Sequence, residues 1–347
     1  MSPVTIEKGS NILVTGVTGF IATHVANQFL KAGYSVTGTA RSEAKADSIR
    51  ALFADYGSDK FKVIITGDLE KEGAFDEAVK DVDAIAHVAS PTSFNPEDPI
   101  RDIINPAVNG TLSLLQSAHK YGKNVKHVVV TSSSATLLDP SDQSPRVYTE
   151  EDWNDQSYEN VSQWKKGDPI NGGLAYSASK VAAERALWKF QKEVSPKFSI
   201  NTILPGVTFG AVIPTPKSSD DITGTPAMIT VYYSGKSTDV TTSSVYLHYV
   251  NVEDVGLAHV RAIERGSETN GERFILIAKE YSLQEVVDIL RKHYPERKDI
   301  IVEGTPGQYP KPIQSIDGSK ATRVLGIEYK SLETSLVELI DSVKQLF

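Results

Sequence analysis

Tyr176 and Lys180 are the residues whose types and spacing most clearly suggest acid–base chemistry. Residues four apart in a helix lie on one face, one turn from each other. A free phenol has a pKa of about 10 and exchanges protons poorly at neutral pH. An ammonium group one turn away favours the phenolate. We therefore expect Lys180 to lower the pKa of Tyr176 and to make it a usable general acid or base.

The spacing alone proves little, because the sequence has 14 tyrosines and about one such pair is expected by chance. Only the Tyr176/Lys180 pair opens a long predicted helix, residues 175–193, that follows a strand ending in hydroxyls, Thr131-Ser-Ser-Ser134. A hydroxyl at that position can hydrogen-bond a carbonyl oxygen as negative charge builds on it. These residues leave open which of the three serines does so.

A turn rich in small residues joins the predicted strand 12–14 to the predicted helix 20–31. Gly16, Gly19 and Ala22 fall in the turn and in the first turn of the helix. Small residues let a pyrophosphate approach the backbone, and the helix N-terminus offers unpaired N–H groups with a partial positive charge. The pattern predicts a dinucleotide site, with an ordinary βα turn as the alternative.

The second predicted strand, residues 35–39, indicates which dinucleotide. NAD-binding units usually carry an acid about 20 residues past the glycines, and none stands here. Arg41 offers a planar fork of donors suited to a 2′-phosphate, and Lys45 lies one helical turn further on. The pair predicts NADPH as the cofactor. The alternative is two solvated loop cations.

The remaining pattern alternates strands and helices and predicts an α/β fold with a doubly wound, mostly parallel sheet. Asp68 and Leu69 follow the third strand, where Asp68 could accept a hydrogen bond from adenine or cap the next helix. Residues 137–172 are read as an irregular insertion and residues 209–245 as loop. The other expected strands are 62–66, 84–89, 128–130, 200–204, 246–250 and 273–278, and the other expected helices are 43–54, 74–79, 103–119, 253–264, 283–294 and 332–347.

Composition excludes several classes of function. The chain has 347 residues, no cysteine and a formal charge of −8, so thiol chemistry is absent and nucleic acid is an unlikely partner. No apolar run is long enough to span a membrane, and no metal-ligand pattern is present. We expect a cytoplasmic protein, monomeric or homodimeric, with a small-molecule carbonyl compound as its partner.

These motifs together resemble the extended short-chain dehydrogenase/reductases. The resemblance rests on the glycine turn, Asp68-Leu69, the serine segment, the Tyr176/Lys180 pair and Leu204-Pro-Gly-Val-Thr-Phe-Gly210, and it extends to the tail at 317–326. Within this superfamily the sequence is similar to the dihydroflavonol-reductase-like branch, and there to fungal NADPH-dependent aldehyde, ketone and methylglyoxal reductases. The resemblance implies reduction of an aldehyde or ketone to an alcohol.

The resemblance also implies roles for individual residues. Tyr176 is the implied proton donor, and Lys180 is implied to adjust the pKa of Tyr176 and to bind the ribose of the cofactor. Ser133 is the implied serine that polarises the carbonyl, with a one-residue shift to Ser134 as the alternative. The implied cofactor residues are Gly16, Thr18, Gly19, Phe20, Ile21, Arg41, Lys45, Asp68, Leu69, Ala89, Lys180, Pro205, Gly206 and Val207. The residues expected to line the substrate pocket are Phe94, Ser134, Phe209 and Tyr246.

The expected organisation is a cofactor domain and a smaller substrate lobe whose segments alternate along the chain. Residues 1–208 and about 246–278 form the Rossmann part, and residues 209–245 and about 279–347 form the lobe. Two other functions remain open at this point. One is a nucleotide-sugar epimerase or dehydratase of the same superfamily with bound NAD, and the other is a non-catalytic regulator that senses NADP.

Overall fold

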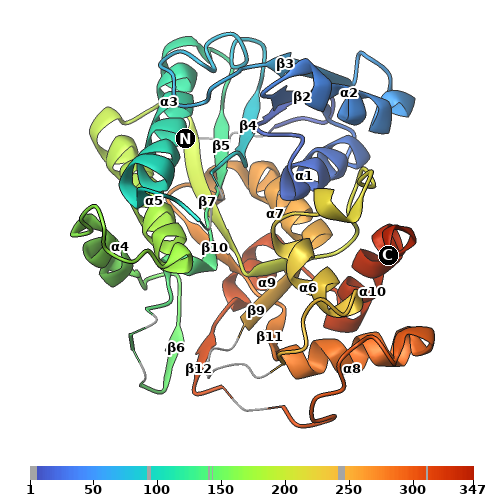
Figure 1. Ribbon diagram of the computed structural model, residues 1–347. Helices are drawn as coiled ribbons and strands as arrows, with labels where there is room; N and C mark the ends of the chain where they lie inside the picture. Colours follow the sequence, from blue (N-terminus) through green and yellow to red (C-terminus); the bar gives the residue numbers. More distant parts are fainter. Residues whose placement is uncertain (1–5, 92–94, 140, 143, 241–246, 310–311) are drawn as a thin grey trace.

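A seven-stranded, fully parallel sheet forms the centre of the molecule (Figure 1). The computed structural model describes residues 6–91, 95–139, 141–142, 144–240, 247–309 and 312–347. The strand order is β10-β7-β5-β4-β1-β2-β3. The strands are β1 Asn11–Val14, β2 Ser35–Ala40, β3 Phe61–Ile65, β4 Ala84–His87, β5 His127–Thr131, β7 Ser199–Pro205 and β10 Arg273–Leu276. This order confirms the predicted doubly wound α/β fold.

Helices cover both faces of the sheet because successive side chains of each strand point to opposite faces. Ile12 and Val14 of β1 face one apolar core, which α1 and α7 close. Leu13, between them, faces the other core, which α3 and α5 close. The helices flanking the sheet are α1 Phe20–Lys31, α2 Glu43–Leu52, α3 Asn105–Tyr121, α5 Gly172–Val194, α7 Val252–Arg265 and α9 Ser319–Leu325.

Another apolar core, separate from the two on the faces of the central sheet, lies beyond the carboxyl end of β7 and is called the second core below. There a three-stranded sheet of order β11-β9-β8 packs with α6, α8 and α10. These elements are β8 Val207–Phe209, β9 Leu247–Asn251, β11 Lys279–Tyr281, α6 Thr225–Tyr233, α8 Leu283–His293 and α10 Leu332–Val343. The division into a cofactor domain and a lobe stays a prediction, and β9, which was expected in the Rossmann part, belongs to this three-stranded sheet.

Several local predictions were wrong. The expected helix at 74–79 is part of a series of turns over residues 72–81, in which Gly73 has a φ of +78°. A run of six residues is too short to repay helix nucleation unless its caps help. The supposed loop 209–245 contains α6, and the supposed irregular insertion 137–172 contains β6 Arg146–Tyr148 and α4 Asp155–Ser162. The sequence analysis also missed β8, β11, α9 and β12 Gln314–Ile316.

Burial explains why α6 was missed. Its residues, Thr225–Tyr233, are rich in β-branched and aromatic side chains, which have low helix propensity. Ile229 and Tyr233 are buried in the second core, so tertiary packing outweighs that propensity. None of the helices that the structure describes has the length and apolar character needed to cross a membrane.

Candidate active site

The small-residue turn lies where the strand order reverses, between β1 and its neighbours β2 and β4. Parallel α/β sheets bind ligands at the carboxyl edge of this position. Gly16 adopts a left-handed conformation with φ +66°, and a Cβ on it would lie 3.0 Å from the Cβ of Ala89. Glycine is therefore required at position 16 by conformation and by space.

Hydroxyl groups hold this turn in place. Thr39 Oγ1 at the end of β2 accepts a hydrogen bond from the Gly16 N–H at 3.0 Å. Thr15 Oγ1 accepts from the N–H groups of Val88 and Ala89, each at 3.0 Å. The turn is thereby tied to both neighbouring strands before any ligand arrives.

The start of α1 is left open to a ligand. Gly19 is the N-cap, and no side chain among the described residues caps the helix there. The first N–H groups of a helix, here those of Phe20 and Ile21, have no intrahelical acceptor. Thr18 is half-buried in the turn beside them. The five residues from Thr18 to Ala22 thus present an anion site of the kind expected for a pyrophosphate.

The predicted nucleotide residues lie at the ends of β2 and β3. Arg41 follows β2, and Lys45 lies in the first turn of α2. Both are exposed, and within the described part of the chain neither forms an ion pair. Asp68 is exposed and accepts a hydrogen bond from the Glu70 N–H at 3.1 Å, so it closes a turn and does not cap a helix. Leu69 packs against the core.

Three consecutive hydroxyls at the end of β5 have three different partners. Thr131 Oγ1 lies 2.8 Å from His259 Nε2 of α7. Ser132 Oγ donates to Glu184 Oε2 of α5 at 2.6 Å. Ser133 forms a hydrogen bond with Tyr176. Ser133 is therefore the serine that the fold brings to the tyrosine.

Tyr176 and Lys180 lie one turn apart on α5, as predicted, with Lys180 Nζ 5.8 Å from the tyrosine ring centroid. The predicted electrostatics were wrong, however. Burial raises the pKa of Tyr176, and the hydrogen bond with Ser133 opposes this only in part. Burial also lowers the pKa of Lys180 to about 8, so the amine is still mostly protonated at neutral pH, but its charge does not outweigh the effect of burial on the phenol. Tyr176 is therefore a protonated donor at neutral pH.

A small internal cavity of about 20 Å³ lies beside Lys180. His87 borders it, and burial lowers the pKa of His87 to about 3, so its ring is neutral. Thr15 Oγ1 already accepts hydrogen bonds from two backbone N–H groups, so its own hydrogen is donated to His87 Nδ1, at 2.9 Å. Nε2 then carries the hydrogen and has no partner among the described residues. The space and this donor suit one water molecule.

The segment after β7 was predicted to lie along the nicotinamide, and this stays a prediction. Pro205 ends β7, and Gly206 and Val207 lead into β8. Phe209 is a correction: it is fully buried in the second core, between Tyr249 and Tyr281, and offers no surface to a substrate. Its aromatic character had suggested a pocket wall, but β8 turns it inward.

The other predicted substrate residues are placed differently. Ser134 is buried and begins the short 3₁₀ turn after β5, next to Ser133. Phe94 and Tyr246 lie outside the described residues. No cluster of three metal-ligating side chains occurs in the ranges that the structure describes.

Sequence reasoning missed a buried ion pair between Glu184 of α5 and Arg273 of β10. The Arg273 Nε–Glu184 Oε1 distance is 2.8 Å, and both side chains are buried. The signal was present, since Glu184 lies one helical turn beyond Lys180. A lone acid in a helix is usually solvated, so its partner on a distant strand was needed to recognise it.

Comparisons with known proteins show which proteins this chain is similar to. Ketoreductase azaE of Aspergillus niger is 34% identical over 96% of this chain and 97% of its own length. NADPH-dependent methylglyoxal reductase GRE2 of Saccharomyces cerevisiae is 32% identical over 94% of this chain and 96% of its own. The crystal structure of yeast methylglyoxal/isovaleraldehyde reductase Gre2 complexed with NADPH is 30% identical, covers 96% of this chain and 98% of that one, and has a TM-score of 0.86.

The family described as the NAD dependent epimerase/dehydratase family matches residues 12–278. This range holds the glycine turn, the serine segment, the Tyr176/Lys180 pair and the strand β10. The match and the near full-length relatives confirm the resemblance to the extended short-chain dehydrogenase/reductases. The chain belongs to the NAD dependent epimerase/dehydratase family.

Proposed function

We propose that this chain reduces the carbonyl group of an aldehyde or ketone to an alcohol, with Tyr176 as the proton donor and NADPH as the cofactor. The observation that carries the proposal is the grouping of Ser133, Tyr176 and Lys180 at the carboxyl edge of the sheet. A hydroxyl donor, a protonated phenol and a buried ammonium are the groups that such a reduction needs.

The enzyme class and the cofactor have independent support from the relatives. Relatives named as reductases align over nearly the whole chain, and one of them is solved with NADPH. The residues present fit that cofactor. The open start of α1 suits a pyrophosphate, and the unpaired cations Arg41 and Lys45 suit a 2′-phosphate.

Each residue of the group has a distinct task in the proposed reaction. When bound, NADPH supplies the hydride. Ser133 donates a hydrogen bond to the carbonyl oxygen, and Tyr176 gives its phenolic proton to the same oxygen as charge builds there. Lys180, buried beside the phenol, stabilises the phenolate that remains. Pro205, Gly206 and Val207 form the wall along the nicotinamide.

The test is a Tyr176→Phe variant assayed for NADPH oxidation with methylglyoxal, an aryl aldehyde, a β-keto ester and a dihydroflavonol. We expect kcat to fall about 10²–10⁴-fold, because the proton donor is removed while the ring is retained. Tyr158→Phe, at an exposed tyrosine of α4, is the matched control and retains full turnover. Unchanged turnover by Tyr176→Phe would refute the proposed mechanism.

The same assay separates the two other functions considered above. A nucleotide-sugar epimerase would show no net NADPH oxidation with any of these carbonyl compounds. A regulator would bind NADP(H), seen as a change in nucleotide fluorescence, without turnover of any substrate. No turnover of any of the four compounds, despite NADP(H) binding, would point to the regulator or to a nucleotide-sugar enzyme.

A further inference from the structure

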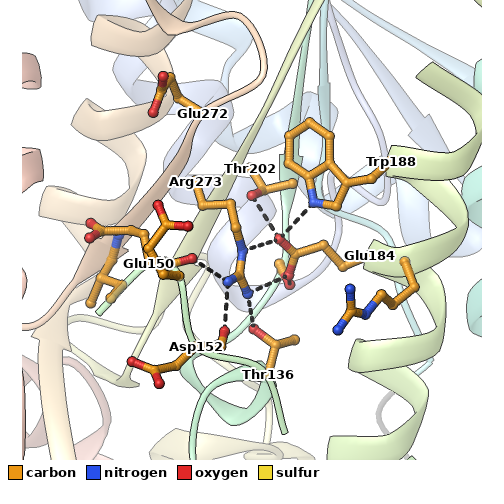
Figure 2. A network of polar contacts seen from close by, with 12 residues as sticks. Thr136, Glu150, Asp152, Glu184, Trp188, Thr202, Glu272 and Arg273 are labelled. Carbon is orange, nitrogen blue, oxygen red and sulfur yellow. Dashed lines mark hydrogen bonds and ion pairs between the residues drawn. The ribbon is translucent and has the colours of Figure 1, made fainter. Parts of the chain in front are cut away.

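Glu184 is a buried carboxylate on α5, the helix that carries Tyr176 and Lys180 and is called the catalytic helix below. The proposed reaction does not use this carboxylate. Its two oxygens accept hydrogen bonds from four side chains, so the charge is fully satisfied inside the protein. Figure 2 shows three of these donors, Thr202, Trp188 and Arg273, around the carboxylate. The donors are Ser132 Oγ at 2.6 Å, Thr202 Oγ1 at 3.0 Å, Arg273 Nε at 2.8 Å and Trp188 Nε1 at 3.2 Å.

The three guanidinium nitrogens of Arg273 all donate hydrogen bonds, so this charge is as fully satisfied as that of Glu184. Its Nη1 donates to the backbone oxygens of Glu150 and Asp152, at 2.5 and 2.8 Å, and its Nη2 donates to Thr136 Oγ1 at 3.0 Å. Its guanidinium carbon lies 3.9 Å from the ring centroid of Trp153. Figure 2 shows the guanidinium at the centre of these contacts. Such a side chain has a single orientation.

The ion pair contacts the chain on both sides of Ser133. On the side before it, Ser132 donates to Glu184. On the side after it, Thr136 accepts from Arg273 and donates through Oγ1 to the backbone oxygen of Ser133 at 2.8 Å. Tyr176 lies on the same helix as Glu184, two turns earlier. The pair therefore links the two segments that carry Ser133 and Tyr176.

We propose that the Glu184–Arg273 ion pair is a positioning device that holds Ser133 in register with Tyr176. The inference rests on the proposed function, since it assigns the pair to the alignment of those two residues. Reacting groups must be held to within a fraction of an ångström, and small displacements reduce turnover strongly.

Two further observations favour positioning over a purely structural role. A buried ion pair is not in itself an efficient way to stabilise a fold, because both charges lose their hydration. Glu184 also acts on the catalytic helix directly, because its charge opposes the fall in the pKa of Lys180 that burial causes. The other polar groups around Lys180 are the neutral His87, the phenol of Tyr176 and the hydroxyls of Ser90, Thr111, Thr131, Ser132 and Thr202.

The experiment removes single hydroxyl groups, because removing either charge leaves the other buried and unpaired, which is strongly destabilising. Ser132→Ala removes the hydrogen bond to Glu184 before Ser133. Thr136→Val removes the hydrogen bonds after it, from Arg273 and to the Ser133 backbone oxygen. Thr202→Val is the matched control, because it also removes one hydroxyl donor from Glu184 but lies on β7, outside residues 131–137.

The readouts are kcat and KM with NADPH and a turned-over carbonyl, the thermal midpoint, and hydrogen exchange of residues 131–137. We expect Ser132→Ala and Thr136→Val to lower kcat about tenfold with little change in KM and to raise exchange in this segment. We expect Thr202→Val to retain kcat within about twofold, with a similar loss of thermal midpoint.

Two results would overturn the inference. One is kcat values and exchange for Ser132→Ala and Thr136→Val that match those of Thr202→Val. The other is a loss of kcat that simply follows the loss of thermal midpoint in all three variants. Failure of the proposed function is seen separately, as full turnover by Tyr176→Phe, and the exchange of residues 131–137 still decides whether the pair holds this segment.

Discussion

Consecutive residues at the end of an extended strand point to opposite faces, so neighbouring hydroxyls can have different partners. Thr131 points to His259 of α7, and Ser132 points to Glu184 of α5. Ser133, beyond the end of β5, meets Tyr176, which also lies on α5. Ser133 Oγ also accepts a hydrogen bond from the Ala135 N–H at 3.1 Å. This bond orients the hydroxyl, and the hydrogen of Ser133 is left to be donated to another acceptor. At the scale of single residues, the site thus depends on which side of one strand a hydroxyl occupies.

Arg41 carries a prediction about cofactor choice. In an Arg41→Ala variant we expect the KM for NADPH to rise about tenfold or more, because a bidentate phosphate contact of about 1.5–3 kcal/mol is lost. The KM for NADH, which has no 2′-phosphate, stays nearly constant. Steady-state kinetics with both nucleotides at a fixed carbonyl concentration measures the two values.

Arg50 provides the control for this change. It lies on α2, is already paired with Glu43 and Asp47, and is not part of the proposed site. Arg50→Ala is expected to leave both KM values unchanged. Equal rises in the KM for NADPH and NADH in Arg41→Ala would contradict the assignment of Arg41 to the 2′-phosphate.

At the scale of elements, β7 and β9 cross closely at Gly206. A Cβ on this residue would lie 2.4 Å from the backbone oxygen of His248 and 2.6 Å from Cδ1 of Ile277. We expect Gly206→Ala to lower the free energy of unfolding by about 1–3 kcal/mol, as overpacking does. It also lowers turnover, since Pro205 and Val207 move with it. Urea unfolding and the reductase assay measure the two effects.

Gly110→Ala, on α3, is the control for Gly206→Ala. No atom of the described residues lies within 4 Å of a Cβ added there, apart from its own helix. Gly110→Ala is expected to raise the free energy of unfolding by about 0.5–1 kcal/mol, because alanine loses less backbone entropy in a helix. A Gly206→Ala protein as stable as wild type would show that β7 and β9 can separate without cost.

Strong local patterns made much of the fold predictable. The βαβ turn at Gly16, the continuous apolar strands and the 3.6-residue period of α5 all agree with the structure. Features that depend on tertiary packing were not predictable. The helix α6 forms from residues of low propensity, and Phe209 turns into a core whose other half lies in α8 and α10. The raised pKa of Tyr176 likewise depends on burial, which no spacing in the sequence reveals.

At the scale of the whole molecule, buried neutral histidines set the response to acid. Burial lowers the pKa of His87 to about 3 and those of His127 and His259 to about 4. A folded-state pKa below the unfolded value near 6.5 gives stability that is present above pH 6.5 and lost as the pH falls. Burial raises the pKa of Asp254 to about 6, so this carboxyl gains stability as the pH falls below 6 and offsets one histidine.

We therefore expect the free energy of unfolding to fall between about pH 6 and pH 4.5 with a net slope of at least about two protons, since burial also lowers the pKa values of His24 and His248. This corresponds to about 3 kcal/mol per pH unit. Urea unfolding at a series of pH values measures the slope. His127→Gln, at a site away from the proposed reaction, reduces the slope by about one proton. A free energy that stays constant over this range would contradict the neutral, buried state of these rings.

The second core depends on α10 in a way that concerns the order of synthesis. Ser342 Oγ of this helix accepts from the Val212 N–H at 2.9 Å, and Ser335 Oγ accepts from Asn251 Nδ2 at 3.0 Å. The helix thus supports the segment after β8 and the end of β9. All seven strands of the central sheet have been translated by residue 276. A nascent chain therefore has its complete sheet sequence and glycine turn well before residues 332–343 leave the ribosome, and only then do these two segments receive their support.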